Sequence, residues 1–71
     1  MKIAVVGMGL IGGSLLKAAE AAGFDVVGLH HGDNADLSDR ELIFAALPPR
    51  SIKPWIDAHE ATFKEGAILV D

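Results

Sequence analysis

The stretch "GMGLIGGS" at residues 7–14 places four glycines in eight positions. The run before it, "KIAVV" at residues 2–6, stays apolar after its lysine, which predicts a strand buried on both faces. The run after it has apolar residues at helical spacing and ends at Gly23, which predicts a helix over residues 11–22. The chain therefore opens with a glycine-rich turn that joins a buried strand to a helix.

Three of these glycines fit the pattern G-x-G-x-x-G in its strand–turn–helix context. Gly7 would allow a tight turn, Gly9 would let the backbone approach a pyrophosphate, and Gly12 would let the helix pack closely on the strand. The helix N-terminus offers free N–H groups and a partial positive charge to the phosphates. The pattern predicts a dinucleotide site, and the alternative is a glycine-rich turn that binds no ligand.

The rest of the chain continues the alternation of strands and helices. Apolar runs predict strands over residues 25–30 and 41–47 and a short buried strand over residues 67–70, with a polar loop over residues 31–39. A second helix is expected from a cap at Ser51 to about residue 64, with Pro54 in its first turn.

This order predicts a single α/β domain over residues 1–71, a small Rossmann-like parallel sheet of about four strands with flanking helices. The second expected strand should form one edge, followed by the first, the third and the fourth. The short loop must cross the sheet nearly taut, which leaves one face thinly covered. Because apolar patches of several hundred Å² usually find a partner, self-association is expected.

The composition excludes several classes of protein. The net charge is −4 and the six cations are scattered, which argues against nucleic acid or an anionic membrane as a partner. There is no cysteine, so disulfides and thiolate metal sites are excluded, and no apolar run approaches the ~20 residues of a membrane span. The strand-like run that begins at Lys2 leaves no room for a signal peptide, so a cytoplasmic protein is expected.

The identity of the dinucleotide depends on the end of the second strand. NAD sites usually place an acid there to bind the ribose hydroxyls, but this chain has His30 and His31, with Asp33 further on. The pair is compatible with NADP, with an NAD site that uses Asp33, or with two exposed loop histidines. A zinc site at the histidines lacks a third ligand, so no metal site is predicted.

Two further positions complete the expected site. The backbone at Leu47–Pro48 should line the nicotinamide side, because Rossmann ligands lie outside the carboxyl ends of the strands. Ser14 either hydrogen-bonds a phosphate or is simply a small residue near the turn. The expected cofactor-binding residues are Gly7, Gly9, Leu10, Ile11, Gly12, Ser14, His30, His31, Leu47 and Pro48.

Three stretches carry a family resemblance: "VVGMGLIGGSLLKAAEAAGFDVVG", "LIFAALPPRSIKPWI" and "FKEGAILVD". They resemble the prephenate and arogenate dehydrogenases of tyrosine biosynthesis, in which "GLIGGS" is more specific than the glycine pattern alone. The resemblance implies the NAD(P)-binding portion of an oxidoreductase whose small carboxylic acid substrate loses CO₂ as hydride passes to the nicotinamide.

The departures from the family bear on activity. Where members carry a helix, a strand and more, this chain has only residues 31–39. The family's catalytic histidine and substrate-binding arginine match nothing here, so no catalytic residue is assigned and the chain alone is expected to be inactive. The alternatives are a dinucleotide-binding module without chemistry, such as a redox sensor, and a truncated gene product that folds poorly or only as an oligomer.

Overall fold

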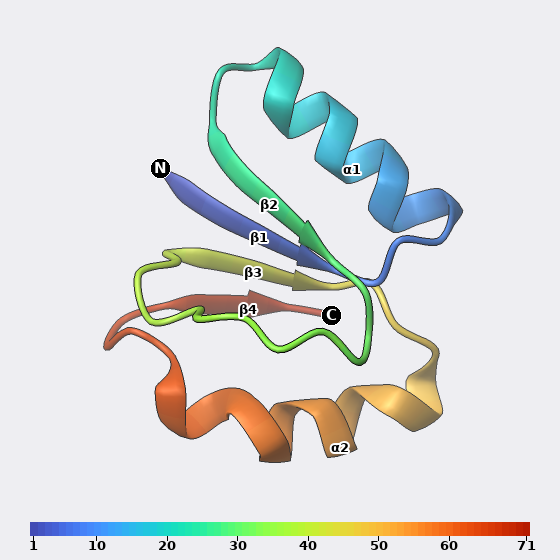
Figure 1. The fold of residues 1–71 in the computed structure, drawn as a ribbon, viewed down its shortest axis with the longest axis vertical. Helices are drawn as coiled ribbons and strands as arrows, with labels where there is room; N and C mark the ends of the chain where they lie inside the picture. Colours follow the sequence, from blue (N-terminus) through green and yellow to red (C-terminus); the bar gives the residue numbers. More distant parts are fainter.

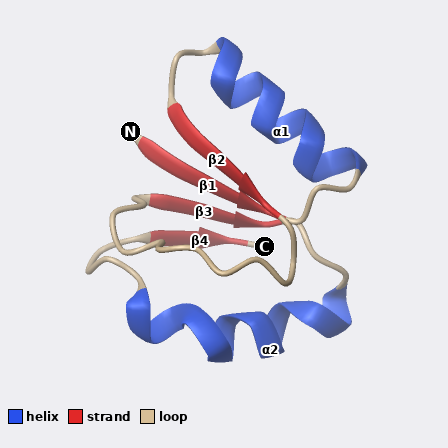
Figure 2. Cartoon of the chain, viewed as in Figure 1, coloured by secondary structure: helices blue, strands red, loops and turns tan.

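The four strands form one parallel sheet in the order β2-β1-β3-β4, as the sequence predicts (Figure 1). The structure is a computed structural model that describes residues 1–71. In chain order the elements are β1 (Lys2–Val6), α1 (Leu10–Ala21), β2 (Asp25–Leu29), β3 (Leu42–Ala45), α2 (Pro49–His59), the 3-10 helix η1 (Glu60–Thr62) and β4 (Ile68–Val70). The fold is α/β, a small Rossmann-like arrangement with two flanking helices (Figure 2).

The two helices lie on opposite faces of the sheet. The β1–α1–β2 crossover moves across the sheet in one direction and the β3–α2–β4 crossover in the other. Because parallel crossovers are right-handed, opposite directions place the helices on opposite faces. Successive side chains of β1 follow this division: Val5 meets α1, whereas Ala4 and Val6 meet Trp55 of α2.

The α2 face holds the hydrophobic core. Its fully buried cluster consists of Ala4, Val6, Leu37, Ile43 and Trp55. Leu37 belongs to the connection between β2 and β3, and it is only 2% exposed. The connection between β2 and β3 therefore runs on the same side of the sheet as α2. Leu37 is its one side chain in the buried cluster on that side.

The connection is fastened at its C-terminal end by Arg40. The Nη1 of Arg40 donates to the backbone oxygen of Asp25 at 3.1 Å and to its carboxylate at 3.0 Å, and it lies 3.4 Å from the Ile3 oxygen. The Arg40 side chain is 11% exposed, and its Nε lies 3.4 Å from a carboxylate oxygen of Asp39. One side chain thus joins the connection to Ile3 of β1 and to Asp25, the first residue of β2.

Lys2 makes a second attachment. Its ammonium donates to Asp39 at 3.0 Å, and its backbone N–H donates to the Glu41 carboxylate at 3.0 Å. These hydrogen bonds hold the pKa values of Asp39 and Glu41 below their usual range. Asp39 and Glu41 are therefore bound to the first strand in their ionised form.

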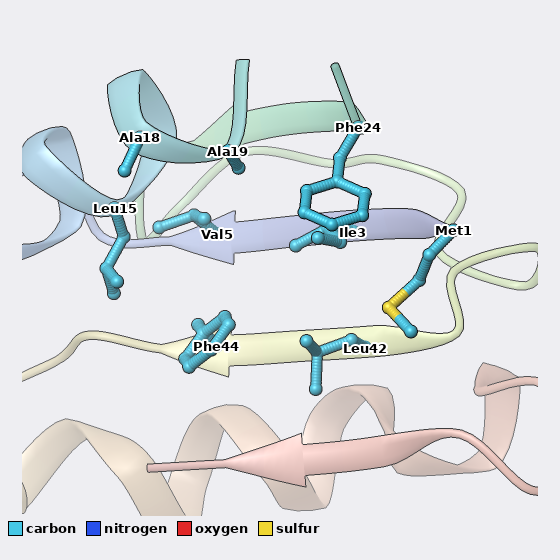
Figure 3. Close-up of a pocket in the computed structure, with 9 residues that line it drawn as sticks. All are labelled: Met1, Ile3, Val5, Leu15, Ala18, Ala19, Phe24, Leu42 and Phe44. Atoms are coloured by element: carbon cyan, nitrogen blue, oxygen red, sulfur yellow. The ribbon is translucent and has the colours of Figure 1, made fainter. Parts of the chain in front are cut away.

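The α1 face is covered over β1 and β2 but open over β3 and β4. α1 contacts β1 and β2, and Figure 3 shows Ala18 and Ala19 of α1 near β1, with Leu42 and Phe44 on the next strand, β3. An apolar hollow of about 320 Å³ lies here between α1 and β3. Ile68 and Val70 of β4 are 59% and 39% exposed. The expected thin cover is thus present, but the prediction of a buried fourth strand is wrong, because neither helix covers this face of β4.

The second helix differs most from prediction. It begins at Pro49, with Pro48 as the N-cap in extended conformation, rather than at Ser51. A residue that precedes proline avoids the helical region, and proline suits the first helical position, so the Pro48–Pro49 pair sets this start. Pro54 consequently lies inside the helix, where it has no N–H to donate to the carbonyl of Arg50, which is an exposed residue. The helix ends at His59 and continues as η1, short of residue 64.

The other boundaries shift by one or two residues. α1 begins at Leu10, β2 stops at Leu29 before the two histidines, and β3 runs over Leu42–Ala45 rather than over residues 41–47. The shorter β3 leaves Ala46–Pro48 as a loop at the carboxyl end of the sheet.

Candidate functional site

Gly7 and Gly12 are required by the fold itself. Gly7 has φ +96°, and a Cβ there would overlap the carbonyl oxygen of Ala46. A Cβ on Gly12 would overlap the carbonyl oxygen of Gly7, so α1 can approach the turn only because that side chain is absent. These two glycines therefore fix the turn and the helix against β3, whether or not a ligand binds.

The fold does not require a glycine at position 9. Its φ of −71° and ψ of −167° suit any residue, and a Cβ built on it meets nothing within 4 Å. It is the N-cap of α1, a position that Ser, Thr, Asp or Asn would stabilise. The chain thus has a glycine where its own folding favours a side chain, and the space beside that glycine is open.

The N-terminus of α1 points its free amides into this space. The first helical hydrogen bond runs from the Gly13 N–H to the Gly9 oxygen at 2.8 Å, so the preceding amides of the first turn have no helical acceptor. No side chain caps them, and the first turn carries no acidic residue. Their partial positive charge is therefore uncompensated and favours an anion.

The turn is one wall of a cleft at the carboxyl ends of the strands. The cleft has a volume of about 770 Å³, which falls within the ~300–1,000 Å³ of small-molecule sites. The lining residues are Gly7, Met8, Gly9, Leu10, Ile11, Gly12, His30, His31, Gly32, Ala46, Leu47 and Pro48. It lies where the chain leaves β1 in one direction and β3 in the other, the switch point at which such folds bind ligands.

Nine of the ten residues predicted for the site line this cleft, and Ser14 does not. The Ser14 hydroxyl donates to the Leu10 oxygen at 2.8 Å, within α1. It borders an adjoining niche together with Gly9, Gly13 and Lys17. The structure therefore places Ser14 beside the glycine turn rather than in the main cleft.

At the end of β2 the structure brings Asp33 back to the histidines. Asp33 accepts from the His30 N–H at 2.9 Å, and its own N–H donates to the His30 oxygen at 3.0 Å. The same carboxylate oxygen lies 3.5 Å from Nδ1 of His30. The Asp33 carboxylate and the His30 imidazole thus lie side by side at the end of β2, although Asp33 is three residues after His30 in the sequence. In dinucleotide sites the end of this strand is where an acid binds the ribose.

The third histidine, His59, and the aspartate that follows β4, Asp71, lie elsewhere. The His59 ring stacks on Trp55 at 4.6 Å, and its Nδ1 lies 2.8 Å from the Trp55 oxygen, an arrangement within α2. Asp71 follows β4 and borders a separate small hollow with Ile11 and Phe44. Neither residue lines the cleft.

The sequence interpretation missed Ala46, Met8 and Gly32 as lining residues. Ala46 lies against Gly7, and its N–H donates to the Val6 oxygen at 2.8 Å. The two residues are far apart in the sequence, so no local pattern could have predicted this contact. Met8 occupies a variable position of the glycine pattern, between Gly7 and Gly9. That position was the only sequence signal that could have marked Met8 as a lining residue.

The only ionisable side chains that line the cleft are His30 and His31. No carboxylate lines it, and the groups with shifted pKa values, Asp36, Asp39, Glu41 and Lys53, do not line it either. No three His, Asp or Glu side chains converge as metal ligands. The cleft offers backbone amides, two imidazoles and apolar walls, and the amides at the N-terminus of α1 suit an anionic group.

Comparisons with known proteins found no matching family model and no matching curated protein. None of the helices has the length and apolar surface needed to cross a membrane.

Proposed function

We propose that the cleft binds a nicotinamide dinucleotide, NAD or NADP. Gly9 carries the proposal, because it combines an open space for a ligand with an N-cap position where a side chain would serve the fold better. A pyrophosphate needs both the space and the free amides that surround it. The donors and the shape of the turn therefore fit the cofactor.

The lining residues suggest how the cofactor lies. The pyrophosphate would rest on the first turn of α1, with Leu10 and Ile11 supplying amides. The adenosine ribose would lie at His30 and His31, and the nicotinamide beside the Leu47–Pro48 backbone at the end of β3. A bound nicotinamide supplies hydride transfer, and the chain's part is to hold and orient it.

We propose further that this site belongs to an oxidoreductase of the prephenate and arogenate dehydrogenase type, active in tyrosine biosynthesis. Residues 7–12 of the stretch "GMGLIGGS" and residues 46–48 of the stretch "ALPP" form two walls of one cleft. Both are stretches on which the family resemblance rests. Their meeting at one site supports the proposal, although each lies in a different half of the chain.

A dinucleotide-binding module without chemistry is the second candidate. It is favoured by the lining of the cleft, which holds two imidazoles but neither a carboxylate nor an arginine to bind an acidic substrate. The two candidates share the cofactor and differ in turnover. For the chain of 71 residues we expect cofactor binding without oxidation of prephenate or arogenate.

The test is a fluorescence titration with NADH and NADPH, with ADP-ribose as the competitor. Binding should be saturable, and ADP-ribose should displace the cofactor because it keeps the pyrophosphate and lacks the nicotinamide. Amide chemical shifts should move at Gly9 and Leu10 and stay unchanged at Leu42 on the open face. Shifts at Leu42 alone would place the ligand in the apolar hollow and contradict the proposed site.

Turnover is measured on the same chain, with NAD or NADP and either substrate. Cofactor reduction that depends on prephenate or arogenate would contradict the expectation that the chain alone is inactive. It would also show that a catalytic group lies within these residues.

A further inference from the structure

The end of β2 is fixed directly against the glycine turn. Leu29, the last residue of β2, pairs with Val6 of β1, and its carbonyl oxygen accepts from the Gly7 N–H at 2.7 Å. These contacts hold the next residue, His30, at the wall of the cleft. His30 therefore lies beside the turn proposed for the pyrophosphate, on the side where the adenosine ribose would follow.

His30 and Asp33 are joined through the backbone, and their side chains stand just short of a direct contact. Oδ2 of Asp33 accepts from the His30 N–H at 2.9 Å, and the Asp33 N–H donates to the His30 oxygen at 3.0 Å. The same Oδ2 lies 3.5 Å from Nδ1 of His30. That distance is long for a hydrogen bond but suits an ion pair. The turn thus holds a carboxylate where it can pair with the imidazole once the ring gains a proton.

Few other charged groups face this position. His31 lines the same cleft, but its side chain makes no ion pair with Asp33. The facing walls, residues 7–12 and 46–48, carry no ionisable side chain. Lys17 of α1 borders the adjoining niche rather than the cleft. The charge beside the ribose position is therefore set by the two histidines and Asp33, and His30 is the one that meets the carboxylate.

We propose that His30 and Asp33 select between NADH and NADPH according to pH, an inference that rests on the proposed dinucleotide site. With His30 neutral, the charge of Asp33 is unpaired, so the carboxylate accepts from the ribose hydroxyls of NADH and repels the 2′-phosphate of NADPH. With His30 protonated, both ring nitrogens donate, so Nδ1 pairs with Asp33 and Nε2 is left for the 2′-phosphate. One proton thus cancels the repulsion and supplies a cation.

The direction of the effect follows from the groups that titrate. Histidine is the side chain whose charge ordinarily changes between about pH 5 and 8. A phosphate monoester takes up its second proton only near pH ~6, so from about pH 8 to 6.5 the 2′-phosphate keeps most of its charge. Acidification across this range should therefore favour NADPH over NADH. Because the His30 and Asp33 side chains are 77% and 49% exposed, the effect is that of one solvated charge pair.

The test is a fluorescence titration with NADH and with NADPH at several pH values from about 6.5 to 8, at constant ionic strength because salt screens exposed charges. The dissociation constant for NADH divided by that for NADPH should increase about fivefold as the pH falls, the size expected of one charge pair in water. NADH is the internal control, because it lacks the 2′-phosphate and should not bind more tightly in acid.

A second measurement counts protons. Calorimetric titrations in buffers of different ionisation enthalpy should show that NADPH binds at about pH 7 with net uptake of protons, whereas NADH takes up none. In His30→Gln both the proton uptake and the pH dependence should be lost, because glutamine donates a hydrogen bond but carries no charge. The backbone N–H of residue 30 still donates to Asp33 in this variant, so the turn should persist.

His59→Gln is the matched control, because it makes the same change at a histidine that lies within α2 and does not line the cleft. It should keep the pH dependence of the wild-type chain. Saturable binding of both cofactors with an affinity ratio independent of pH would overturn the selector and leave the dinucleotide site standing. Loss of the pH dependence in His31→Gln but not in His30→Gln would overturn the assignment to His30. Binding of neither cofactor at any pH would overturn the selector together with the proposed function.

Discussion

The carbonyl oxygen of Gly7 occupies the place that a Cβ on Gly12 would need. One glycine makes the turn out of β1, and the other lets α1 begin directly above that turn. The contact is between two backbones, so no side-chain rotation can relieve a clash. The strand, the turn and the helix are therefore joined into one rigid unit, which holds Gly9 at its outer surface.

Gly12→Ala should be strongly destabilising. The added methyl group can be accommodated only if α1 moves away from the turn, and overpacking of this kind costs about 1–3 kcal/mol. Thermal unfolding followed by circular dichroism should show a large decrease in the melting temperature. Gly13→Ala is the matched control, because a Cβ there meets nothing and alanine favours the helix by up to about 1 kcal/mol. Equal stability of the two variants would contradict the contact.

Gly9→Asp should separate binding from folding. The carboxylate enters the space proposed for the pyrophosphate and repels it, so NADH and NADPH binding should be lost. The same carboxylate caps α1 and complements its dipole, so the fold should gain a few tenths to about 1 kcal/mol. The measurements are a cofactor titration and a melting curve on one sample. Tight binding by Gly9→Asp would show that the glycine turn is not the phosphate site.

Much of this site could be predicted because its signals are local. The strand, the glycines and the helix that follow one another near the N-terminus carry the glycine pattern, and the alternation of strands and helices predicts a parallel sheet. Leu47 and Pro48 could be predicted as lining residues because ligands of such folds bind at the carboxyl ends of the strands.

What the sequence does not predict depends on contacts between distant residues. Leu37 lies in a polar stretch, so no periodicity marks it as part of the core, yet it packs against Trp55. Ala46 approaches Gly7 only because β3 lies beside β1. The burial of β4 was predicted from its composition, but composition cannot report that no helix covers Ile68 and Val70 on the α1 face.

Leu37→Ala should come close to unfolding the chain. Truncation of a buried leucine costs about 2–5 kcal/mol, and no other side chain of the connection belongs to the buried cluster. Denaturant titration should show a large decrease in the unfolding midpoint. Leu10→Ala is the control, because Leu10 is 89% exposed and its loss should change stability by no more than ~0.5 kcal/mol. A midpoint unaffected by Leu37→Ala would mean that the connection does not pack on this face.

Stability should fall in acid through the carboxylates of the connection. The pKa of Asp36 is lowered by hydrogen bonds from Ser38, that of Asp39 by the Lys2 ammonium, and that of Glu41 by the Lys2 N–H. A lowered pKa in the folded chain adds stability above the unfolded values of about 3.9–4.3, and this stability is lost as the pH falls below them. The melting temperature should therefore decrease below about pH 4.

Asp39→Asn tests the origin of that decrease. The variant should be less stable than wild type at neutral pH and should lose less on acidification, because one of the ionised contacts is already absent. Glu20→Gln, which removes a carboxylate without an ion pair or hydrogen bond, should leave the pH profile unchanged. Identical profiles for wild type and Asp39→Asn would assign the acid dependence to other groups.

Asp33→Asn should shift the cofactor preference toward NADPH. The Asp33 carboxylate at the end of β2 can bind the ribose hydroxyls of NADH, and its charge repels the 2′-phosphate of NADPH. Asparagine keeps the acceptor for the His30 N–H, so the turn should persist without the charge. Two unit charges ~4 Å apart in water interact by about 1 kcal/mol, so the affinity ratio should change by about fivefold. Parallel titrations with both cofactors measure it, with Asp36→Asn as the control, because Asp36 accepts from the Ser38 N–H and has no contact with His30. If Asp33→Asn changes the affinity for neither NADH nor NADPH, the Asp33 carboxylate does not contact the ribose, and the histidines alone bind it.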